Sequence, residues 1–227
     1  MMKRNIVVSA IFLAMTFSAS AVTIDIRHEY LDDNRYNRDR IQVSHRFANG
    51  FGFFIEGKFK SGGNSADKPF SDIVDNGSEY SLNYTYQISP QFSIQPGMEF
   101  EVASAKSIYK PYLRSWYNFD SGIYLSLRYR YEYVRETTAG KEDEHINRGD
   151  IWLGYRWQNL TFETNYVYKS SDTLKYNNKK DDYEYNGRVA WKINSEWTPY
   201  IEVGNVSVYT TQDDRQTRFR VGVQYTF

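Results

Sequence analysis

One stretch of the chain decides the fold class. Residues 123–133 read Ile-Tyr-Leu-Ser-Leu-Arg-Tyr-Arg-Tyr-Glu-Tyr, with apolar or aromatic side chains at every odd position and mostly polar ones between them. A period of two predicts a β-strand with one apolar face and one charged face. Eleven such residues are about the length that a tilted strand needs to cross a bilayer. The stretch therefore indicates a membrane-spanning strand.

The same period recurs along the chain and predicts about twelve strands. Each predicted strand places charged side chains on one face and apolar or aromatic ones on the other. This is the pattern of an all-β, transmembrane antiparallel β-barrel, whose outer face meets lipid and whose inner face meets water. The predicted strands cover residues 23–31, 40–47, 51–60, 79–88, 92–101, 109–119, 123–133, 150–157, 160–169, 183–193, 197–203 and 216–227.

The connections between these strands alternate in length, as they do in outer-membrane barrels. An even number of strands places both chain ends on the side of the short turns, which is the periplasm. Tight turns are predicted at 49–50, 89–91, 120–122, 158–159 and 194–196, and longer polar loops at 32–39, 61–77, 103–107, 135–147, 170–181 and 209–214.

Composition supports the same fold. Aromatic residues make up 18% of the 227 residues, yet the mean hydropathy is only -0.69. A soluble sandwich or a lipocalin-like barrel would need an apolar interior, whereas here one face is charged on nearly every strand. The chain contains no Cys, which excludes a disulfide framework and thiol chemistry. The formal net charge is zero, so charge balance alone names no partner.

The first residues predict export. Lys3 and Arg4 precede an apolar run over 6–17, and Ala19-Ser20-Ala21 forms a small-x-small cleavage site. The apolar run is shorter than the roughly 20 residues of a spanning helix. We therefore expect a cleaved signal peptide at 1–21 and one outer-membrane barrel at 22–227.

The polar face, assigned to the lumen, carries the candidate functional residues. Rings of Arg or Lys are how pores favour anions, and a guanidinium binds carboxylates with two parallel hydrogen bonds. The alternative is that each cation pairs with a neighbouring glutamate and stiffens a filled barrel. Two cations one residue apart are expected to resist full neutralisation, as at Arg128/Arg130 and Arg218/Arg220. The predicted substrate path comprises Arg27, Arg40, Arg46, Lys110, Arg114, Arg128, Arg130, Arg156, Arg188, Arg218 and Arg220.

Five segments resemble the KdgM-type oligogalacturonate-specific porins: 45–52, 109–114, 127–130, 199–206 and above all 214–227. The resemblance implies a monomeric twelve-stranded outer-membrane channel whose lumen arginines attract acidic oligosaccharides. Such porins have relatives that pass sialic acid, so the sugar stays open. In 135–190 no motif matches, so alternation alone supports Arg156 and Arg188. The motif arginines that carry over are Arg46, Arg114, Arg128, Arg130, Arg218 and Arg220.

Two other function classes are weaker. An outer-membrane barrel enzyme needs a nucleophile or activated water beside a positioned histidine. His28 and His45 fall on the lipid face, and His145 lies in an acidic loop without ligand spacing for a metal. An adhesin would act through long loops, whereas these loops are modest. We expect no catalytic residue, metal or cofactor. Acidic oligosaccharides and outer-membrane lipid are the expected partners, and no nucleic acid.

Overall fold

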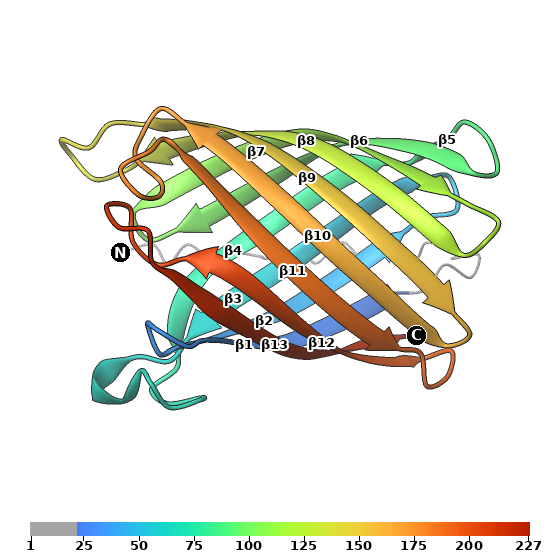
Figure 1. Ribbon diagram of the computed structural model, residues 1–227, viewed down its shortest axis with the longest axis horizontal. Coiled ribbons are helices and arrows are strands. Elements are labelled where there is room, and N and C mark those ends of the chain that lie inside the picture. The colour runs from blue at the N-terminus through green and yellow to red at the C-terminus, as the bar shows by residue number, and fades with distance from the viewer. Residues whose placement is uncertain (1–21) are drawn as a thin grey trace, which may run out of the picture.

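The chain folds into a closed antiparallel β-barrel. The computed structural model describes residues 22–227 (Figure 1). The predicted signal peptide, 1–21, lies outside the described residues. The elements are β1 (Val22–Leu31), β2 (Tyr36–Arg46), β3 (Phe51–Lys60), η1 (Gly63–Ser65), β4 (Val74–Tyr84), β5 (Tyr86–Gln87), β6 (Phe92–Ala103), β7 (Lys106–Asn118), β8 (Ile123–Glu136), β9 (Glu144–Trp157), β10 (Leu160–Ser171), β11 (Asp181–Trp191), β12 (Trp197–Ser207) and β13 (Arg215–Thr226).

Closure comes from two pairings that join the ends of the sheet. Strand β1 pairs with β13, and β4 pairs with both β3 and β6. The short β5 continues β4 after an interruption at Thr85 and pairs with the start of β6. Because β4 and β5 together form one interrupted strand, the barrel wall has twelve strand positions, which confirms the predicted barrel of about twelve strands. Closure removes the long unpaired edges that an open sheet of the described residues would expose, as a spanning sheet requires.

The two faces of the barrel carry opposite chemistry. On the outer face, Ile26, Leu82 and Leu127 are about half exposed, at 51%, 58% and 45%. On the inner face, charged side chains such as Asp25 and Lys110 are only 4% and 5% exposed. Because successive side chains of a strand point to opposite faces, the period of two in the sequence becomes an apolar exterior and a charged interior.

Aromatic rings gather near both ends of the outer face. At the end with the tight turns, Trp197 and Tyr225 lie 4.7 Å apart between ring centroids. At the other end, Tyr109 stacks on Tyr133 at 6.1 Å and Tyr133 on His145 at 5.1 Å. Two such bands are typical of the interfaces between hydrocarbon and lipid headgroups. Among the described residues, no helix is long and apolar enough to cross a membrane.

The predicted tight turns lie at one end of the barrel and the longest connections, 61–73 and 172–180, lie at the other (Figure 1). The predicted long loop 103–107 is wrong, because β6 and β7 stay paired up to a two-residue turn at 104–105. Several strands extend beyond the predicted limits, because their polar ends keep pairing in the ladder. Strand β2 begins at Tyr36, so the predicted loop 32–39 shortens to 32–35, and β9 begins at Glu144 inside the predicted loop 135–147. The N–H of Phe227 donates to the carbonyl of Val22 at 3.0 Å, so both ends of the described chain meet on the tight-turn side.

Candidate functional site

The inner wall surrounds a cavity of about 530 Å³ that is rich in arginine. Eight guanidinium groups line it against four carboxylates, so cations outnumber acids in its lining. These residues are Arg27, Arg40, Arg114, Arg128, Arg148, Arg188, Arg218 and Arg220, with Asp25, Glu163, Glu184 and Glu202.

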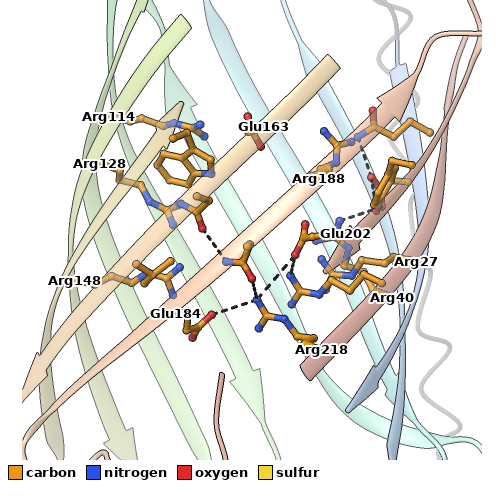
Figure 2. A pocket seen from close by; sticks show the side chains of 18 residues that line it. Arg27, Arg40, Arg114, Arg128, Arg148, Glu163, Glu184, Arg188, Glu202 and Arg218 are labelled. Atoms are coloured by element: carbon orange, nitrogen blue, oxygen red, sulfur yellow. Dashed lines mark hydrogen bonds and ion pairs between the residues drawn. The ribbon is translucent and has the colours of Figure 1, made fainter. Parts of the chain in front are cut away.

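The arginines form two groups that face each other. Arg114, Arg128 and Arg148 come from the neighbouring strands β7, β8 and β9 (Figure 2). The other group comes from β11, β13, β1 and β2 and lies across the cavity. Each arginine faces inward because it occupies the polar phase of its strand, so strand alternation alone produces both groups.

The pair Arg128 and Arg130 is fully engaged by carboxylates. Arg128 donates to Asp150 at 3.0 Å and lies 3.4 Å from Glu99. Arg130 donates to Glu99 at 2.6 Å and to Glu132 at 2.5 Å. The expectation that two cations one residue apart resist neutralisation is therefore wrong here. Glu99 of β6 reaches both guanidinium groups from across β7, while Asp150 of β9 pairs with Arg128 and Glu132 of β8 with Arg130.

The pair Arg218 and Arg220 is also neutralised. Arg220 donates to Glu29 at 2.7 Å on one side and to Glu202 at 2.6 Å on the other. Arg218 donates to Glu184 at 3.2 Å. The same expectation is wrong for this pair, because β1, β11 and β12 each supply a carboxylate.

Three other cavity arginines make no ion pair within residues 22–227: Arg27, Arg114 and Arg188. Their cross-strand neighbours explain this for the first two. Arg27 lies opposite Gly222 and Arg40, and Arg114 lies opposite Gln95 and Arg128, so neither faces a carboxylate. These guanidinium groups keep their charge available to the cavity.

Aromatic rings hold Arg114 in place. Its guanidinium carbon lies 4.1 Å from the ring centroid of Trp116 and 4.0 Å from that of Trp152. Its Nε donates to the hydroxyl of Ser126 at 2.8 Å. Stacking on aromatic faces leaves the outer N–H groups of an arginine unspent, and these N–H groups are the donors that a carboxylate needs.

The remaining predicted residues divide between paired cations and the tight-turn end. Arg40 donates to Asp25 and Glu56, each at 3.0 Å, and Lys110 bonds Glu101 and lies 3.2 Å from Glu79. Arg46 and Arg156 lie outside the cavity and bond neutral oxygens. Arg46 donates to Asn83 at 2.9 Å and to Thr85, and Arg156 donates to Asn118 at 3.0 Å.

Sequence reasoning missed Arg148, which lines the cavity and donates to Asp150 at 2.7 Å. Arg148 lies just beyond the predicted loop 135–147. It is two residues before Asp150 and therefore on the same strand face, which is the signal that indicates its inward orientation. The three histidines lie on the outer face, where His28 pairs with Asp39 at 2.8 Å. In the described part of the chain, no three His, Cys, Asp or Glu side chains gather as a metal site.

Comparison with known proteins places the chain. The family model described as "Oligogalacturonate-specific porin protein (KdgM)" matches residues 15–227. The chain belongs to the KdgM porin family. This KdgM-family match runs through 135–190, where no motif was recognised, and so includes Arg148, Arg156 and Arg188.

Individual relatives agree in length. The chain is 46% identical over 211 residues to the uncharacterized protein YiiY of Salmonella typhimurium, covering 92% of each chain. It is 37% identical over 238 residues to the oligogalacturonate-specific porin KdgM of Dickeya dadantii, covering 100% of both. A solved KdgM porin in complex with disordered oligogalacturonate is 34% identical, with a TM-score of 0.68, and covers 90% of this chain and 99% of that one.

Proposed function

We propose that this KdgM-family chain is an outer-membrane channel that passes acidic oligosaccharides, foremost oligogalacturonates, by facilitated diffusion. One observation carries the proposal: Arg27, Arg114 and Arg188 line a single cavity and have no carboxylate partner within residues 22–227. A uronate oligomer has one carboxylate per sugar, so several separated guanidinium groups can bind it in turn.

Weak binding suits such a channel. A site must attract the substrate enough to draw it in and release it quickly enough to let it leave. Water in the lumen screens each contact, so one pair contributes about 1 kcal/mol or less. Selectivity then comes from several contacts acting together, while no single contact traps the sugar.

The same proposal includes orientation, assembly and the absence of catalysis. Both ends of the described chain lie at the tight-turn end, which we assign to the periplasm. The channel acts as a monomer, because the sugar path lies within one barrel. Its histidines point to the lipid side and away from the cavity, which argues for transport without chemistry.

Single-channel recording of purified protein in planar bilayers tests this function. Trigalacturonate should block the current at lower concentration than a neutral trisaccharide, and reversal potentials in a KCl gradient should show anion preference. Sialic acid, which has one carboxylate, serves as the competing blocker. Tighter block by sialic acid would make it the substrate, and cation preference would refute the acidic-sugar channel. Lipase and protease assays on the same preparation should show no turnover.

A further inference from the structure

Three inward tyrosines lie flat against the wall of the barrel, each over a glycine of the adjacent strand. In every case the tyrosine and the glycine are direct cross-strand partners. A Cβ on Gly154 would lie 2.0 Å from the Tyr124 ring, so no larger residue fits beneath it. The pairs are Tyr112 over Gly97, Tyr124 over Gly154 and Tyr200 over Gly222.

The missing Cβ lets a ring cross a whole strand. Tyr124 belongs to β8, passes over Gly154 of β9, and donates its hydroxyl proton to Glu163 of β10 at 2.5 Å. Tyr200 of β12 crosses Gly222 in the same way and donates to Asp25 of β1 at 3.0 Å. In both cases, a neutral hydroxyl group donates a hydrogen bond to a carboxylate that lines the arginine-rich cavity.

This arrangement explains why Arg188 makes no ion pair in the described part of the chain. Its direct neighbours on β10 and β12 are both acidic, Glu163 and Glu202. Glu202 accepts from Arg220 at 2.6 Å, and Glu163 accepts from Tyr124. The Arg188 guanidinium instead lies 4.3 Å from the centroid of the Tyr200 ring. Stacking on a ring face is favourable for a cation and leaves its N–H groups open to a ligand.

We propose that Tyr124 and Tyr200 are positioning residues that keep Arg188 available to an anionic sugar. Tyr124 does this by hydrogen bonding the carboxylate that would otherwise neutralise Arg188, and Tyr200 by supporting the guanidinium from below. Gly154 and Gly222 provide the space that both rings need. The inference rests on the proposed function, since it explains how uncharged residues keep one guanidinium group of that cavity free to bind an anionic sugar.

Removing one oxygen atom tests the role of Tyr124. Tyr124→Phe retains the ring over Gly154 but frees Glu163 to turn toward Arg188. Trigalacturonate block should weaken by about two- to fivefold, the factor that a screened ion pair represents. In a Glu163→Gln background, where no carboxylate is left to unmask, Tyr124→Phe should leave block unchanged. Tyr112→Phe is the matched control, because the Tyr112 hydroxyl lies 3.4 Å from the amide oxygen of Gln95 and bonds no carboxylate among residues 22–227.

The outcomes separate the two proposals. Equal weakening by Tyr124→Phe in both backgrounds, or no weakening in either, would overturn the role of Tyr124. A wild-type channel without anion preference would refute the proposed function. Even then, the effect of Tyr124→Phe on trigalacturonate block, compared between channels with Glu163 and channels with Glu163→Gln, would decide whether the hydroxyl masks Glu163. The unboiled gel mobility of each variant in detergent reports that the barrel has folded.

Discussion

Replacing the three unpaired arginines together by glutamine should weaken sugar block far more than it alters the barrel. Arg27, Arg114 and Arg188 make no ion pair within residues 22–227, so their removal leaves no carboxylate without its partner. Each lost contact is worth about 1 kcal/mol or less in a water-filled lumen, so block by trigalacturonate should weaken by about tenfold to a hundredfold.

The control removes the same charge elsewhere. Lys68, Lys141 and Lys179 are exposed residues of the long loops, and their replacement by glutamine also lowers the net charge by three. At about 0.1 M salt the Debye length is roughly 10 Å, so these distant lysines act weakly on a sugar inside the barrel. Trigalacturonate should therefore block the loop variant nearly as strongly as it blocks the wild-type channel.

Blocking constants from single-channel currents measure the difference. Raising KCl from about 0.1 M to 1 M shortens the Debye length to roughly 3 Å, so wild-type block should weaken and approach that of the arginine variant. If trigalacturonate blocks the arginine variant and the lysine variant equally well at low salt, the arginines do not contact the sugar. The channel would then select by width or through its loops.

Two further predictions concern stability and processing. Arg130→Gln leaves Glu99 and Glu132 without the guanidinium that both share, so the free energy of unfolding in detergent should fall by about 2 kcal/mol, whereas Arg114→Gln should cost less than half of that; equal urea midpoints for the two variants would contradict this ranking. The mature protein should begin at Val22 within a residue or two, and the intact mass of protein purified from outer membranes checks this, since a mass that includes residues 1–21 would rule out cleavage.

The fold could be predicted because its determinants are local. A strand that meets lipid on one side and water on the other must alternate, and residues 123–133 display that alternation without reference to any other part of the chain. Turn chemistry is local as well, so Asn49-Gly50 marked a tight turn correctly. The predicted strand limits were less accurate. A polar strand end such as Tyr36–Asp39 is extended because it pairs with β1, and its own residues do not indicate that pairing.

The candidate site depended on the register between strands that are distant in the chain. Alternation placed Arg188 and Arg220 on the inner face correctly, but their opposite situations could not be read from the sequence. Arg220 meets Glu29 from 191 residues away, because β13 closes onto β1.

Arg188 is not neutralised by its neighbour Glu163, also because of contacts between strands. The hydroxyl of Tyr124 on β8 reaches across β9 and hydrogen bonds Glu163 on β10. A slip of one residue in either pairing would turn these side chains to the other face. The sequence by itself determined which face each arginine occupies. Only the closed barrel decided which arginines a carboxylate neutralises, because ion pairs form between neighbours in space and barrel closure chooses those neighbours.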